Sequence, residues 1–179
     1  MLALALALTF FAGALLLWDK RTPWQKFLEA DSLAPKPFTR ALKRDAQVFW
    51  LDGVEETWLL LRRPSYFSMA QGAGALFDRQ TALTYARRAR ELVQLDPRDN
   101  FKVPTEDGSV PPVVTAATLA DTCRSSFDLD AIISGRRAPG VPATTWRAPV
   151  SRAVRRREHD TLTYEWEQEF YLYRCSEFR

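Results

Sequence analysis

The sequence predicts a small α/β sandwich, built on one mixed sheet and preceded by one N-terminal transmembrane helix. Residues 2–18 form an uncharged run rich in Leu and Ala, which is typical of a membrane helix. Residues 46–51 form a short apolar and aromatic run that predicts a buried strand, and residues 162–172 alternate between apolar and polar side chains. The order of helix and strand patterns, with antiparallel-looking strands at the end, fits one sheet that helices cover mainly on one face. Acidic residues on one face of the last strand agree with this, because they indicate a face that meets water.

The first region, residues 1–18, is expected to cross a membrane. A helix over residues 2–18 would be about 26 Å long, near the lower limit for a hydrocarbon core about 30 Å thick. A cleaved signal peptide and a buried helix remain alternatives, although no Lys or Arg precedes the run. The positive-inside rule would keep Lys20 and Arg21 in the cytoplasm, so this rule favours a cytoplasmic domain.

Two regions follow this segment. Residues 19–44 are expected to form a juxtamembrane segment with two short helical stretches, which begin near Pro23 and Pro37. Residues 45–179 are expected to form one α/β domain, because their number suits a single hydrophobic core.

Within the α/β domain, helix and strand patterns alternate at first, and strand patterns end the chain. Val54, Trp58 and Leu61 share one helical face, and Asp78 is a suitable N-cap for the longest helix. The expected elements are, in order, a strand at 46–51, a helix at 54–62 capped by Asp52, a short strand at 64–68, an extended stretch at 74–77, a helix from Arg79 to about Leu95, a loop at 96–112, a helix at 113–123, and strands at 127–133, 144–147 and 162–172.

The last strand gives the most specific expectation about burial. Because strand side chains alternate between two faces, Trp166 and Phe170 are expected to be buried. On the other face, Glu165, Glu167 and Glu169 are then expected to meet solvent.

The two cysteines allow one disulfide but no Cys-x-x-Cys site. Cys123 and Cys175 would form a bridge in an oxidising compartment, whereas they would be two buried thiols in the cytosol. The chain-entropy relationship gives such a bridge a stabilisation of about 4 kcal/mol.

The residue patterns indicate no catalytic, metal or cofactor site. The chain has 1 His, His159, so the paired histidines of most catalytic zinc sites are excluded. Acidic residues that alternate along a strand are typical of a solvated face. With a net charge of +3, the chain carries basic clusters at 87–88, 136–137 and 155–157 that favour solubility or anionic headgroups, and no nucleic-acid partner is expected.

One part of the chain carries motif-like residues. They are Arg63, Pro64, Ser65, Tyr66, Phe67 and Ser68 in one segment, and Gln71, Gly72 and Gly74 in the next. The second segment lacks the last glycine of a dinucleotide-binding loop, since Phe77 stands there, and a tight turn is the favoured interpretation. Ser65 and Ser68 would need His159 as a base, which lies in a charged stretch.

Together with residues 48–53 and 170–175, these motifs resemble the C-terminal extracytoplasmic tail of bacterial multi-span membrane glycosyltransferase-like proteins of the protein-mannosyltransferase type. The resemblance implies a periplasmic domain attached to a multi-span membrane core. Together with the one apolar run at residues 2–18, it gives the expectation of a single-pass inner-membrane chain, with the lipid bilayer and the helices of a multi-span protein as partners. It transfers no catalytic residue, because that family keeps its acidic catalytic groups between earlier membrane helices.

The expected function is therefore a non-catalytic extracytoplasmic accessory domain, which stabilises a membrane glycosyltransferase-like core or positions substrate for it. No cofactor is expected. The alternative is a self-standing, single-span binding module for a protein or an anionic lipid.

Overall fold

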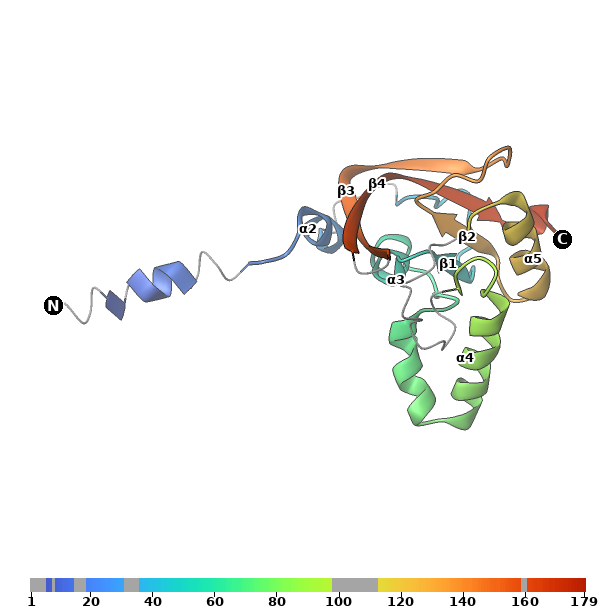
Figure 1. The fold of residues 1–179 in the computed structure, drawn as a ribbon, viewed down its shortest axis with the longest axis horizontal. Coiled ribbons are helices and arrows are strands. Elements are labelled where there is room, and N and C mark those ends of the chain that lie inside the picture. The colour runs from blue at the N-terminus through green and yellow to red at the C-terminus, as the bar shows by residue number, and fades with distance from the viewer. Residues whose placement is uncertain (1–5, 8, 15–18, 31–35, 98–112, 159–160) are drawn as a thin grey trace.

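The fold is built on a four-stranded mixed sheet in the order β1-β2-β4-β3 (Figure 1). β1 (Val48–Trp50) pairs in parallel with β2 (Ala131–Ser134), and β4 (Thr161–Arg174) pairs antiparallel with both β2 and β3 (Thr144–Glu158). The expected mixed α/β architecture is confirmed. The computed structural model describes residues 6–7, 9–14, 19–30, 36–97, 113–158 and 161–179.

The central strands are buried on both faces, which corrects the expectation of one covered face. In β1, Phe49 belongs to one apolar cluster, and its neighbours Val48 and Trp50 belong to another. In β2, Ile132 and Ile133 divide between the same two clusters. Because successive side chains point to opposite faces, two cores flank the sheet and the domain has three layers.

Two helices cover the first face. α4 (Arg79–Glu91) begins at Asp78, whose side chain accepts a hydrogen bond from the backbone N–H of Thr81, as the sequence predicts. α5 (Ala116–Ser125) begins with a reciprocal pair of hydrogen bonds between Thr115 and Thr118. Ala89, Leu119 and other apolar side chains from these helices complete the first core.

The second face is covered by α2 (Pro23–Glu29), α3 (Val54–Glu56) and the wider helical turn η1 (Thr57–Leu61). Trp24 of α2 packs against Phe170 of β4, with ring centroids 5.7 Å apart. The N-cap of α3 is Gly53, which has no side chain to cap the helix, so the expected cap at Asp52 is wrong. Asp52 instead has a φ of 57°, which places its backbone in the left-handed region.

Three local expectations also need correction. Residues 64–68 make only an isolated bridge, between Ser65 and Val48, and residues 74–77 fall at the end of a 3-10 helix, η2 (Met69–Leu76). Phe127 is 82% exposed and lies outside β2. Residues 127–128 form a turn instead, in which the N–H of Leu129 donates to the carbonyl of Ser126 at 3.1 Å.

The burial expected for β4 is confirmed for Phe170 and wrong for Trp166 and Glu167. Phe170 is fully buried, but Trp166 is 72% exposed and Glu167 is 8% exposed. The pairing of β3 with β4 shifts register between Arg147 and Arg152, and the hairpin curves over α3 at this point (Figure 1). The bend moves the face of Trp166 beyond the core and brings Glu167 against Arg152.

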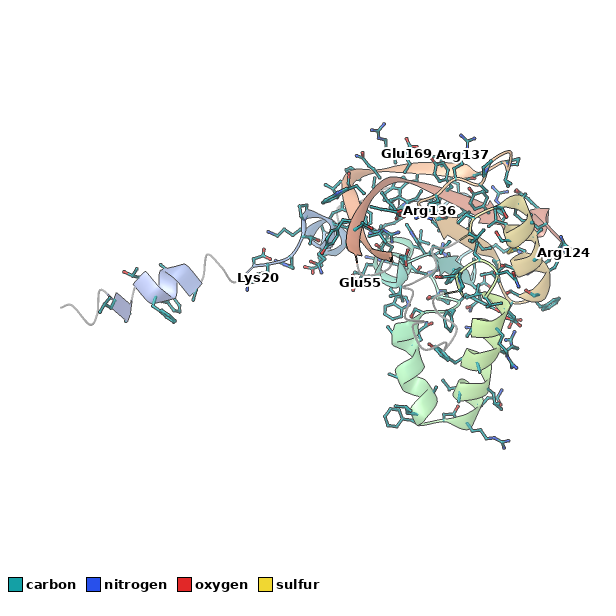
Figure 2. The ribbon with its side chains drawn as sticks, viewed as in Figure 1. Lys20, Glu55, Arg124, Arg136, Arg137 and Glu169 are labelled. Carbon is teal, nitrogen blue, oxygen red and sulfur yellow. A yellow bond between two sulfur atoms is a disulfide. The ribbon has the colours of Figure 1, made fainter. Side chains whose placement is uncertain are left out.

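The other two glutamates of β4 differ in exposure. Glu169 is exposed and lies on the outer side of the hairpin (Figure 2), as expected. Glu165 is half-buried and pairs with Arg136 at 2.5 Å.

The expected disulfide is confirmed. Cys123 of α5 and Cys175, which begins the short 3-10 helix η4 (Cys175–Glu177), are bonded, and their Cα atoms are 5.0 Å apart. Both residues are fully buried in the first core. The bond ties the end of β4 to the helix beside it.

The expected membrane segment needs correction. Within the ranges described above, no helix is both long enough and apolar enough to span a bilayer. The expectation of a single-pass inner-membrane protein is therefore wrong. The described helical stretch 9–14 would cover about 9 Å of a core about 30 Å thick. The rest of the expected span, residues 1–5, 8 and 15–18, lies outside the described residues.

Candidate binding cleft

The motif-like residues meet α4 at one cleft of about 290 Å³. η2 and α4 form a helical hairpin that projects from the sheet (Figure 1). The cleft lies between the segment 66–71 and α4. The side chains that line it are Tyr66, Phe67, Gln71, Gln80, Thr81, Thr84, Tyr85 and Arg88. Three of the nine motif-like residues therefore line the cleft directly.

Hydrogen bonds to β1 hold the first motif segment in place. The N–H of Val48 donates to the carbonyl of Pro64 at 3.1 Å, and the N–H of Tyr66 donates back to the carbonyl of Val48 at 2.8 Å. Tyr66 and Phe67 are buried, and the ring of Phe67 lies 4.8 Å from that of Tyr85. One wall of the cleft is thus fixed by the sheet.

The second motif segment brings η2 close to α4. Gln71 donates Nε2 to the carbonyl of Ser65 at 3.3 Å. A Cβ atom on Gly72 would lie 2.9 Å from the hydroxyl of Tyr85, so this close approach requires glycine. A Cβ atom on Gly74 would lie 3.6 Å from Thr81, which is an ordinary contact.

Tyr66 and Glu91 form a polar link behind the cleft. The hydroxyl of Tyr66 donates to Oε2 of Glu91, and Glu91 also accepts from Nη1 of Arg87 at 2.9 Å. Burial, and then the hydrogen bond to Glu91, raise the pKa of Tyr66 to about 12. Tyr66 is therefore a neutral hydrogen-bond donor at physiological pH.

Arg88 contributes the charge of the cleft. Its guanidinium carbon lies 4.5 Å from the centroid of the Tyr66 ring, and Nη1 donates to the carbonyl of Tyr66 at 2.8 Å. Nε of Arg88 is buried and has no hydrogen-bond partner within the described residues. Sequence reasoning noted Arg88 only as part of a basic pair, because the α4 pattern does not show which segment it faces.

The remaining motif-like residues of the segment 63–68 do not line the cleft. Arg63 donates Nε to the carbonyl of Lys43 at 2.8 Å, and Ser65 donates Oγ to the carbonyl of Phe67 at 3.3 Å. Ser68 precedes η2 and makes no side-chain cap bond. His159, the base that either serine would require, lies outside the described residues. In the ranges that the structure covers, no group of acidic, Cys and His side chains could hold a metal ion.

A second cavity, of about 470 Å³, lies between α2, α3 and the hairpin. Its floor contains Arg152, which donates Nη1 to Glu56 at 3.1 Å and Nε to Glu167 at 3.1 Å. Glu56 also accepts a hydrogen bond from Nε1 of Trp24 at 2.8 Å. These buried groups satisfy one another and join four elements, α2, α3, β3 and β4, so we assign them a structural role.

Among the described residues, two arginines of the basic clusters are held in ion pairs. Arg87 pairs with Asp128 at 2.9 Å, and Arg136 pairs with Glu165. The side chains of residues 155–157 lie outside the described part of the chain. The expected contact with anionic headgroups stays a prediction.

Comparison with protein-family models, with curated proteins and with solved structures found no match to this chain. The resemblance to the tail of membrane glycosyltransferase-like proteins therefore stays a prediction from the quoted residues.

Proposed function

We propose that the chain is a non-catalytic accessory domain that binds a small ligand in the cleft between η2 and α4 and positions it for a membrane glycosyltransferase-like partner. The observation that supports this proposal most is the meeting of two motif segments with α4 at one cleft. Aromatic walls with a few converging polar groups are typical of small-molecule sites. The membrane partner is proposed from the resemblance of the same motif segments.

The disulfide supports an oxidising compartment. Structural disulfides persist in oxidising compartments and are rare in the cytosol. The Cys123–Cys175 bond therefore supports an extracytoplasmic location for the accessory domain.

Nuclear magnetic resonance of the purified full chain tests ligand binding. Glucose, mannose, their uronic acids and their 6-phosphates would be titrated while the side-chain amide signals of Gln71 and Gln80, which line the cleft, are followed. At least one compound is expected to shift these two signals and to leave the signal of Gln168 on β4 unchanged. Shifts confined to other regions, or none with any compound, would overturn the proposal.

A blocking variant gives a matched control. Thr84 lines the cleft, whereas its neighbour Leu83 is 54% exposed. Thr84→Phe is expected to fill the cleft and abolish the shifts, while Leu83→Phe adds a ring of the same size outside it. Equal effects of the two variants would place the ligand elsewhere.

A protein-binding module is the second candidate, and the tip of the helical hairpin favours it. Leu76 and Phe77 are 85% and 87% exposed, and such apolar exposure is typical of interaction sites. Leu76→Ser with Phe77→Ser is expected to remove partner binding without changing ligand binding in the cleft, which separates this candidate from the first.

A further inference from the structure

We propose that the ligand of the cleft carries a carboxylate or phosphate group on a ring of monosaccharide size, and that Arg88 binds this group. The inference rests on the proposed function of the cleft and specifies the class of its ligand. Four features of the cleft carry it: its charge, the unused donors of Arg88, the aromatic walls and the size.

The charge of the lining is positive. Of the eight residues that line the cleft, Arg88 is the charged one, and the others are aromatic, amide or hydroxyl side chains. Two carboxylates bond to residues of the lining, Glu91 to Tyr66 and Asp78 to the backbone N–H of Thr81, and Glu91 is also bound to Arg87. A ligand with a negative group would therefore complete the charge balance of the site.

The neighbouring arginines of α4 show what is particular about Arg88. Arg87 forms ion pairs with Glu91 and Asp128, and Arg90 is exposed at the surface. In the described part of the chain, Arg88 forms no ion pair, and its hydrogen bond to Tyr66 uses Nη1 alone.

The position of the Arg88 guanidinium is fixed in advance. The Tyr66 ring and carbonyl hold it, so little side-chain entropy remains to be lost when a ligand binds. A planar guanidinium with free N–H groups matches carboxylate and phosphate oxygens, often with two parallel hydrogen bonds. An anionic group is therefore favoured over a neutral hydroxyl.

The lining residues and the volume of the cleft indicate what the rest of the ligand is. The buried rings of Phe67 and Tyr85 back the lining of the cleft, and Gln80, Thr81 and Thr84 add neutral hydrogen-bonding groups along α4. A cleft of about 290 Å³ is at the small end for ligand sites, so it suits one ring with a few hydroxyls. Uronic acids and sugar phosphates combine such a ring with the required charge.

Isothermal titration of the full chain at pH 7 with glucose, glucuronate and glucose 6-phosphate tests the inference, because these probes share a ring and differ at one carbon. At least one anionic probe is expected to bind about tenfold more tightly than glucose. Inorganic phosphate serves as a competitor that separates recognition of phosphate alone from recognition of the whole sugar phosphate.

Variants assign the preference to Arg88. Arg88→Gln is expected to reduce the affinity for the anionic probe about tenfold or more. Arg88→Lys keeps the charge but loses the planar guanidinium, so its affinity is expected to lie between that of Arg88→Gln and that of the wild type. Arg90→Gln removes the same charge from an exposed position of α4 and should change affinity less than about twofold. If Arg88→Gln does not fold, comparison of Arg88→Lys with Arg90→Gln still shows whether Arg88 binds the anionic group.

The outcomes separate the two proposals. Equal binding of glucose and the anionic probes at the cleft would overturn the ligand class and leave the proposed function intact. Anionic binding that Arg88→Lys and Arg90→Gln weaken equally would also overturn the role of Arg88. Binding of no probe at the cleft would overturn the proposed function and this inference together.

Discussion

Arg152 and Glu167 form an ion pair in the interior of the fold. Nε of Arg152 donates to Oε2 of Glu167 at 3.1 Å, and the two residues are only 4% and 8% exposed. Arg152 also donates to Glu56 and to the backbone carbonyls of Leu51 and Asp52. This arrangement fixes the bent hairpin to the chain segment that follows β1.

Removal of Glu167 is expected to be far more damaging than removal of the large aromatic residue beside it. Glu167→Ala leaves the Arg152 charge buried with one partner fewer, which should lower the free energy of unfolding by about 3–5 kcal/mol. Trp166→Ala, at a position that is 72% exposed, should cost less than about 1 kcal/mol. Urea denaturation followed by circular dichroism measures both. A larger loss for Trp166→Ala would contradict the bend in the hairpin.

The disulfide is expected to be present in the isolated protein. After alkylation under denaturing, non-reducing conditions, mass spectrometry should find neither Cys123 nor Cys175 modified, and prior reduction should expose both. The Cys123→Ser, Cys175→Ser double variant should lose about 4 kcal/mol of stability, because the bond closes a 52-residue separation in the unfolded chain. Two freely alkylated thiols would contradict the bond.

The two glycines of η2 are expected to respond in opposite ways to alanine. In Gly72→Ala, the new methyl group would meet the Tyr85 hydroxyl, so the Tyr85 side chain or the helical hairpin must shift, at a cost of about 1–3 kcal/mol. Gly74→Ala has room and should leave stability unchanged or raise it by about 0.4–1 kcal/mol. Thermal melts of the two variants provide the comparison, and equal losses would argue against the close approach at Gly72.

Tyr66 is expected to titrate near pH 12. Because its pKa is raised above the ordinary value near 10, its contribution to stability is complete below pH 10 and is lost as the pH rises through 12. The ultraviolet difference spectrum between wild type and Tyr66→Phe should show this transition, since the phenylalanine variant lacks the phenol. A Tyr66 transition at or below pH 10 would contradict both the burial of the phenol and its link to Glu91.

The sequence could predict those features that depend on local pattern. β1 follows from an apolar run, the start of α4 from the Asp78 cap, and the disulfide from the two available cysteines. The burial of Glu167 could not be predicted in this way, because it depends on a register shift and on Arg152 in another strand. A period-two pattern shows which residues share a face but not where a strand bends away from the core.

The cleft was predictable only in part for a similar reason. The sequence singled out residues 63–74, which supply Tyr66, Phe67 and Gln71. The facing wall belongs to α4, where Thr84 and Arg88 have no distinguishing local pattern. Their role depends on the approach of η2 to α4, which the structure places at Gly72.

The strand order has a consequence for how the chain reaches its native state. β3 and β4 meet through a short connection, with Glu158 opposite Thr161, whereas the β1–β2 junction brings together Gln47 and Asp130, which are 83 residues apart. Closing a long loop costs more entropy than closing a short one, so distant pairings form late. The β3–β4 hairpin should therefore assemble first and present β4 as an edge to β2, with β1 added last. Assembly of the sheet then proceeds against the direction of the chain.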